Sequence, residues 1–294
     1  MSPVLALLLL YLFSNVNGNC SNKLPTGLPR SCKDWYDMGA TQSCEYPIFS
    51  NSNVAKMVYC DMEGTNCDGT GGWTRLAFFD MTQPGATCPS GLRQQSFTAI
   101  PHPLCKRPSS SWASCASTKF TAIYSGMKYT EVCGRVRGYQ LGSPEAFVSS
   151  NYYGIESTYV DGVSITHGRY PRKHIWSYAG GYQSHSTSRF ACPCNKGYNG
   201  GSNPSSFIGS HYYCESGTPS GVDYVNGVLY ANDVLWDGKG CDGIEGPCCT
   251  NPKLPWFYRK LSQKTTDDIE LRICNVRETA IDDVPIDIVE IFIR

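Results

Sequence analysis

The sequence predicts a protein of the α+β class that is mainly β, and three features indicate this. Short segments dense in β-branched residues recur along the chain, and 284–293 is the densest of them. Such residues favour a pleated, half-buried strand. Segments with the apolar spacing of an amphipathic helix are scarce, and sixteen cysteines stand among the 294 residues. We therefore expect a β fold whose long loops are held by disulfides.

Residues 1–18 are predicted to be a secretory signal peptide. The apolar run from Val4 to Phe13 is too short to span a bilayer, and it is followed by a suitable cleavage point before Asn19. The alternative is a buried N-terminal helix. Two prolines and a glycine break regular structure in residues 19–31, so we expect a short leader there.

Composition limits the compartment and the partners. An even number of cysteines in an exported chain implies up to eight disulfides, formed in an oxidising compartment. No further apolar segment is long enough to cross a membrane. Lysine plus arginine equal aspartate plus glutamate at 25 each, so no net field attracts nucleic acid. We expect a secreted, extracellular protein with neither a membrane span nor a nucleic-acid partner.

Two strand signals flank a loop in the first third of the chain. Val58 and Tyr59 favour a half-buried strand that contains Cys60. Gly71-Gly72 lets the backbone turn before Trp73, whose large side chain needs a packed pocket. A second strand is predicted over 74–79.

Residues 32–82 resemble the opening part of fibrinogen-like domains, the secreted recognition modules of ficolins, tachylectins and, more distantly, intelectin lectins. The resemblance lies in Cys32 and in the segments Gly39–Ile48, Val58–Met62 and Gly71–Arg75. It implies a fibrinogen-like N-terminal subdomain that binds and does not catalyse, with a disulfide between Cys32 and Cys60. Cys44 and Cys67 are extra relative to that family. A Cys44–Cys67 disulfide would be an added staple, and the sequence leaves the connectivity open.

Residues 83–294 are expected to continue the same globular unit as a disulfide-rich, loop-rich β region. The stretch 83–117 is rich in turns and predicts at most one short helix, while 118–139 predicts one or two strands. Two apolar runs within 159–168 predict a hairpin that turns at Asp161-Gly162.

Further strands are predicted toward the end of the chain. A buried strand is expected over 174–180, followed by a cysteine-pinned loop over 180–221. Apolar residues alternate within 262–274. The segment 284–293 is so apolar that it must pair inside a sheet, because an exposed edge of this kind would invite aggregation.

The second part of the chain resembles a group of secreted, cysteine-rich proteins of cnidarians and sponges, some of them associated with skeletal organic matrices. The shared stretches are His174–Trp176, Leu235–Gly238, Cys248-Cys249, Pro255–Tyr258 and Thr266–Glu270. This resemblance implies an extracellular location and does not imply an activity.

Two sets of residues are candidates for ligand or metal binding. Carboxylates cluster in a glycine-rich loop at Asp233, Asp237, Asp242 and Glu245. Calcium prefers six to eight oxygen ligands, which such a loop could supply, although the spacing matches no EF-hand. The alternative is a solvated loop whose carboxylates cap turns.

Aromatic rings next to polar groups are the second set. Sugars stack on aromatic rings, so the ligand-contact candidates are Trp236, Asp237, Tyr212 and Tyr213. The alternative is ordinary packing of these rings in the core or at a sheet edge.

Other chemistries have weaker support. His185, Cys192, Cys194, His211 and Cys214 could be drawn as a zinc site, but thiols of an exported chain are expected to be oxidised. Neither the Gly-X-Ser-X-Gly nor the His-Glu-X-X-His signature of hydrolases is present.

These observations favour a non-enzymatic extracellular matrix or surface-recognition protein that binds glycans or matrix components, including those of a skeletal organic matrix. The first alternative is a soluble lectin, with calcium as its cofactor if the acidic loop binds it. The second is a secreted enzyme, which would need a nucleophile and a base brought together in a cleft. Oligomeric state is left open by the sequence.

Overall fold

The structure is a computed structural model, and it describes a defined subset of the chain. The described residues are 27–96, 100–108, 114–124, 126–139, 162–169, 172–181, 212–216, 234–235, 256–275 and 285–294. The predicted signal peptide at 1–18 and most of the loop at 180–221 lie outside these residues.

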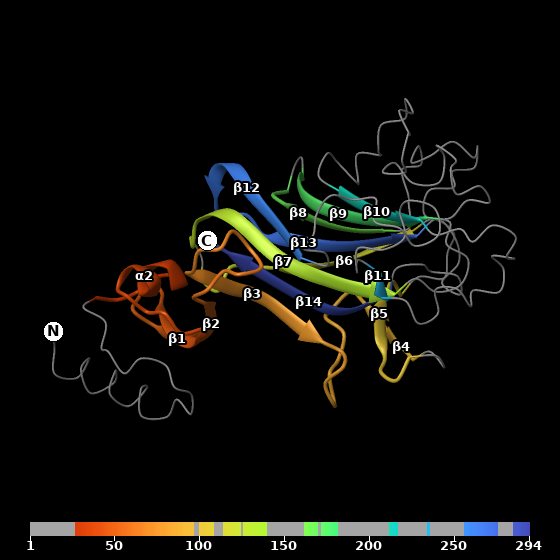
Figure 1. Cartoon of the computed structure of the whole chain (residues 1–294), viewed down its shortest axis with the longest axis horizontal. Coiled ribbons are helices and arrows are strands. Elements are labelled where there is room, and N and C mark those ends of the chain that lie inside the picture. Colours follow the sequence, from red (N-terminus) through yellow and green to blue (C-terminus); the bar gives the residue numbers. More distant parts are fainter. Residues whose placement is uncertain are drawn as a thin grey trace, which may run out of the picture.

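Two β-sheets make up the described part of the chain (Figure 1). The larger sheet has nine strands, which are β1 (Cys44–Phe49), β2 (Ala55–Asp61), β3 (Trp73–Asp80), β4 (Arg93–Gln95), β5 (Leu104–Lys106), β7 (Tyr129–Tyr139), β11 (Val234–Leu235), β12 (Trp256–Thr265) and β14 (Ile286–Ile293). The smaller sheet has the order β10 (Tyr212–Ser216), β9 (Lys173–Gly181), β8 (Gly162–His167), β13 (Ile269–Asn275) and β6 (Ser114–Phe120). The mainly β fold class is confirmed.

The core lies between the two sheets. The larger sheet supplies Val136 and Phe257, and the smaller sheet supplies Ile165, Trp176 and Leu271 to the same buried cluster. Trp176 of β9 stacks on Phe257 of β12, with ring centroids 5.1 Å apart. Because these rings come from different sheets, their contact ties the two layers together.

Strand β14 is the centre of the larger sheet. It pairs antiparallel with β3 on one edge and with β7 on the other, and all eight of its residues are buried. Alternate residues such as Val289 and Ile291 face the core, while Phe292 packs on the opposite face against Trp73 and the half-cystine Cys133. The prediction that 284–293 pairs inside a sheet is confirmed for the described residues.

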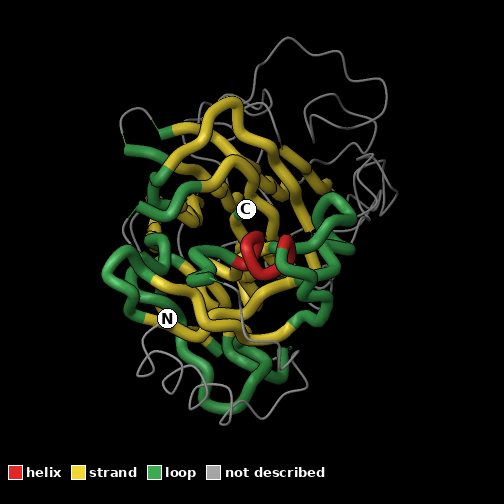
Figure 2. Tube along the Cα trace, turned by 90° about the vertical axis from the view of Figure 1, so that its left-hand side faces the viewer, coloured by secondary structure: helices red, strands yellow, loops and turns green. Residues whose placement is uncertain are grey.

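A short helix of six residues precedes the first strand. Helix α2 (Cys32–Asp37) begins with a capping box, in which Ser31 and Asp34 bond to each other's backbone N–H groups. Trp35 of the helix is buried against β1, where its indole N–H donates to the carbonyl of Pro47 at 2.9 Å. Figure 2 views the molecule from the end at which α2 lies. The sequence analysis did not predict this helix.

Several predicted strands are confirmed and one turn is wrong. Strands are present at 74–79 and 174–180, and the alternating residues Ile269, Leu271 and Ile273 are buried on β13. The expected hairpin turn at Asp161-Gly162 is wrong because Gly162 already belongs to β8, paired with Ala179 and Cys274. A central strand needs backbone partners on both edges, and that requirement outweighs the local turn preference of Asp-Gly.

Three disulfides join described cysteines. The Cys32–Cys60 disulfide implied by the family resemblance is present, and the others are Cys67–Cys133 and Cys88–Cys105. The Cys44–Cys67 pairing is wrong, because Cys67 bonds to Cys133 of β7, with their Cα atoms 5.6 Å apart. Cys44 is itself disulfide-bonded. The loop between β2 and β3 folds over the outer face of the larger sheet, so Cys67 meets a cysteine that is distant in sequence.

Removing the Cys67–Cys133 bridge should destabilise the protein more than removing the Cys88–Cys105 bridge. The first closes a separation of 66 residues and the second one of 17. Loop-closure entropy predicts a loss of roughly 2–5 kcal/mol for the C67S/C133S variant and about 1 kcal/mol less for C88S/C105S. Urea unfolding of both variants measures this difference. A larger loss for C88S/C105S, or a Cys44–Cys67 peptide in a non-reducing digest, would contradict the arrangement.

Candidate functional site

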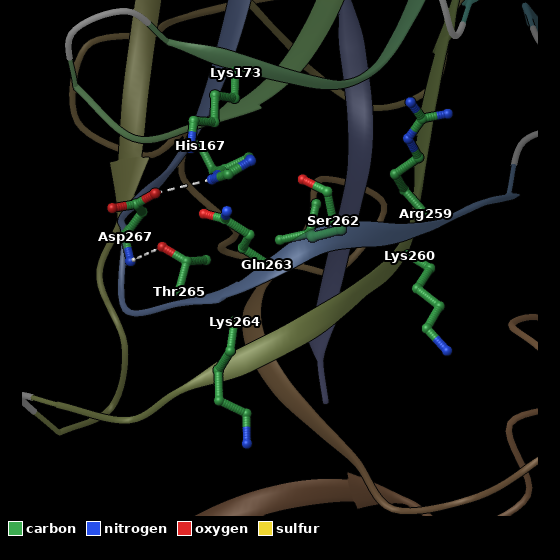
Figure 3. A pocket seen from close by; sticks show the side chains of 10 residues that line it. His167, Lys173, Arg259, Lys260, Ser262, Gln263, Lys264, Thr265 and Asp267 are labelled. Carbon is green, nitrogen blue, oxygen red and sulfur yellow. Dashed lines mark hydrogen bonds and ion pairs between the residues drawn. The ribbon is translucent and has the colours of Figure 1, made fainter.

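A cleft opens beside strand β12, between the larger sheet and the β8–β9 hairpin of the smaller sheet (Figure 3). Its volume is about 580 Å³. The lining residues are His167, Lys173, Arg259, Lys260, Leu261, Ser262, Gln263, Lys264, Thr265 and Asp267. A smaller hollow of about 300 Å³ adjoins it at Lys128, Lys264, Thr265 and Thr266. A cleft of this size is within the range of small-molecule and glycan sites.

The course of β12 decides which side chains face the cleft. Its pairing with β7 shifts register between Lys260 and Thr265, as it does at a β-bulge. Figure 3 shows Arg259 and Ser262 on the side of β12 where His167 lies, whereas Lys260 and Lys264 project from the opposite side. A bulge redirects side chains in this way because it interrupts the strict alternation of a strand.

An aspartate fixes the orientation of His167. The Nδ1 atom of His167 lies 2.9 Å from Oδ2 of Asp267, although 100 residues separate them in sequence. The His167 side chain is 7% exposed. Because a carboxylate accepts hydrogen bonds only, Nδ1 holds the proton and Nε2 is the ring atom available to a ligand.

The loop that holds Asp267 is itself well bonded. The Asp267 N–H donates to the Thr265 hydroxyl at 3.1 Å, and the Tyr129 hydroxyl donates to the Asp267 carbonyl at 3.0 Å. The pKa of the Asp267 carboxyl is lowered by hydrogen bonding to Thr265, and His167 and the nearby Lys173 lower it further. Asp267 is therefore an ionised carboxylate at neutral pH.

Positive charge exceeds negative charge around the cleft. Lys173 and Arg259 form no ion pair with a carboxylate in the described ranges, apart from the longer-range attraction between Lys173 and Asp267. The neighbouring Arg172 differs, because it lies 3.1 Å from Glu270 and 3.7 Å from Asp268. Lys260 and Lys264 also line the cleft, which therefore presents four basic side chains and one oriented imidazole to a ligand.

Serine, histidine and aspartate all line this cleft, which invites a comparison with hydrolases. A nucleophile–base pair requires a hydrogen bond between the serine hydroxyl and the imidazole. Within the described residues no such bond joins Ser262 to His167, and Ser262 is exposed. The described residues thus form a polar cleft without a hydrogen-bonded nucleophile–base pair of this kind.

None of the residues that sequence reasoning singled out is among the described residues that line this cleft. Tyr212 and Tyr213 belong to β10, where they pair with Ser177 and Tyr178 of β9. Trp236 and Asp237 lie outside the described residues, and so do Asp233, Asp242 and Glu245, the remaining calcium candidates. Of the five residues considered as a zinc site, only Cys214 is described, and it belongs to β10.

Across the described residues, no group of three or more His, Cys, Asp or Glu residues is placed to hold a metal ion. No helix within them is long and apolar enough to cross a membrane.

Sequence reasoning missed the cleft. A local signal was available in the basic segment Arg259–Lys264, of which the sequence analysis considered only 262–264, as the start of an apolar alternation. His167 and Lys173 could not be joined to it, because the fold alone brings them near.

Neither a family model nor a curated protein matches this chain. The resemblance of residues 32–82 to fibrinogen-like domains therefore remains a proposal.

The lowered pKa of Asp267 predicts a pH dependence of stability. A carboxyl whose folded-state pKa is depressed stabilises the fold above its ordinary value of 3.8, and this stabilisation is lost as the pH falls through the folded pKa. The free energy of unfolding of D267N should therefore be lower than that of the parent protein well above pH 3.8. The two should converge at more acidic pH. Urea unfolding over a pH series measures this, and a difference that persists below the folded pKa would contradict it.

Proposed function

We propose that the protein is a secreted, non-enzymatic extracellular recognition protein that binds glycans or matrix components. The observation that supports this best is an open, polar cleft on a scaffold of two sheets that disulfides cross-link. A rigid scaffold keeps a binding surface organised, so less conformational entropy is lost when a ligand binds.

The cysteines support an extracellular location. Three disulfides join described residues, and one of them bridges a separation of 66 residues. Such bridges form and persist in oxidising compartments, whereas cytosolic thiols are kept reduced. Cleavage of residues 1–18 as a signal peptide is part of the proposal.

The N-terminal part supports a relationship to fibrinogen-like recognition modules. Residues 32–82 form α2 and strands β1, β2 and β3, and the Cys32–Cys60 bridge holds the helix to β2. Deposition in an extracellular matrix, that of a mineralised skeleton included, is one setting for such a protein.

A lectin is the second candidate, and the cleft favours it. A matrix component held by many weak contacts needs no single cavity, whereas a lectin needs a defined pocket with polar groups that converge on the sugar. Calcium dependence would come from the acidic loop that contains Asp237 and Asp242.

Expression in a eukaryotic secretory cell followed by a glycan array tests this function. The protein should appear in the medium with its N-terminus at Asn19, and it should bind a discrete set of glycans. Binding that survives a chelator assigns the activity to a calcium-independent site, and binding lost in chelator and in D237N/D242N assigns it to the acidic loop. Retention of the protein inside the cell would contradict secretion. A blank array together with no binding to extracellular matrix would contradict recognition.

A further inference from the structure

We propose that the cleft beside β12 binds the anionic group of an acidic glycan, a sulfate or a carboxylate. Arg259 and Lys173 are the charge partners, and His167 contacts an adjacent sugar hydroxyl. This inference rests on the proposed recognition function and names the ligand class of its site.

Most arginines near the sheets are engaged by carboxylates: Arg75 and Arg135 flank Glu290, Arg137 pairs with Asp287, and Arg294 pairs with Glu131. Arg259 has no carboxylate partner in the described ranges and points into the cleft (Figure 3). A guanidinium presents a planar fork of donors that matches the oxygens of a sulfate or a carboxylate.

The pairing of His167 with Asp267 prepares the imidazole for a ligand. A histidine that is 7% exposed and bonded to a carboxylate through Nδ1 is held in one orientation before any ligand arrives. Its Nε2 atom accepts a hydrogen bond from a hydroxyl when the ring is neutral and donates one when the ring is charged. Ser262 and Gln263 line the same wall and offer further polar contacts. An acidic sugar has both kinds of group that these residues recognise.

Charge balance separates an acidic glycan from nucleic acid. The whole chain has 25 basic and 25 acidic residues, and the cleft itself contains the carboxylate of Asp267. A nucleic-acid site requires a broad basic surface that contacts several phosphates. A few cations around one oriented imidazole suit a ligand with isolated anionic groups instead.

Exposed cations outside the cleft provide a charge-matched control. Arg259 and Lys173 line the cleft, whereas Lys56 of β2 and Arg93 of β4 are exposed and line neither hollow. Neutralising either pair removes the same formal charge from the protein. Diffuse electrostatic attraction would respond equally to both changes, and a specific site would respond only to the first.

Affinity measurements on the full secreted chain test the inference. The probes are heparin for sulfate, hyaluronan for carboxylate and dextran as the neutral polymer, each titrated calorimetrically. The R259Q/K173Q variant should bind the preferred acidic polymer at least tenfold more weakly, whereas K56Q/R93Q should stay within about twofold of the parent, tenfold being about 1.4 kcal/mol. H167Q should also weaken binding. Thermal unfolding of each variant verifies that the fold is retained.

Three results would overturn the inference. These are equal losses in the two charge-matched variants, no preference of the parent protein for either acidic polymer over dextran, and displacement of the bound polymer by equimolar duplex DNA. If R259Q/K173Q still binds the glycans found on the array, the cleft assignment fails while the recognition function stands. If the parent binds neither polymers nor array, both fail.

Discussion

The burial of strand β14 on both faces and both edges is the constraint on which the rest of the structure depends. Its eight residues are apolar apart from Asp287 and Glu290, and all are buried. A strand of this composition is stable only when both of its edges are paired, because unpaired backbone and exposed apolar surface invite aggregation. Partners come from β3 on one side and β7 on the other, so segments more than fifty residues apart become neighbours.

That position of β14 determines where charges and polar surfaces occur. Glu290 faces outward from the sheet and lies between Arg75 and Arg135, at 3.4 and 3.2 Å, since a buried carboxylate is costly without charged partners. The loop pinned by Cys67–Cys133 covers the neighbouring Phe292. Strand β12 lies at the other edge of β7 and buries only Phe257. Its residues 259–265 are therefore available to form the wall of a polar cleft. The larger sheet thus has a buried centre at β14 and an exposed edge strand, β12, at which we propose that ligands bind.

Local chemistry could be predicted from the sequence, and long-range register could not. The β-branched density of 284–293 and the alternation around Leu271 predicted buried strands correctly, because burial of one face leaves a periodic pattern. Helix α2 was missed although Ser31 and Asp34 form a recognisable capping box. The Cys67–Cys133 bridge and the His167–Asp267 pair depend on which strands lie side by side, and no local pattern encodes that.

Native-state hydrogen exchange over a series of low denaturant concentrations tests the central role of β14 most directly. If β14 joins β3 and β7 into one cooperative unit, the core amides of these three strands should exchange through one opening. Examples are the amides of Ala77, Val136 and Ile291. The free energy of that opening should equal that of global unfolding. Exchange of the β3 amides at a distinctly lower free energy than those of β7 and β14 would show that residues 32–82 unfold separately, and it would contradict this account.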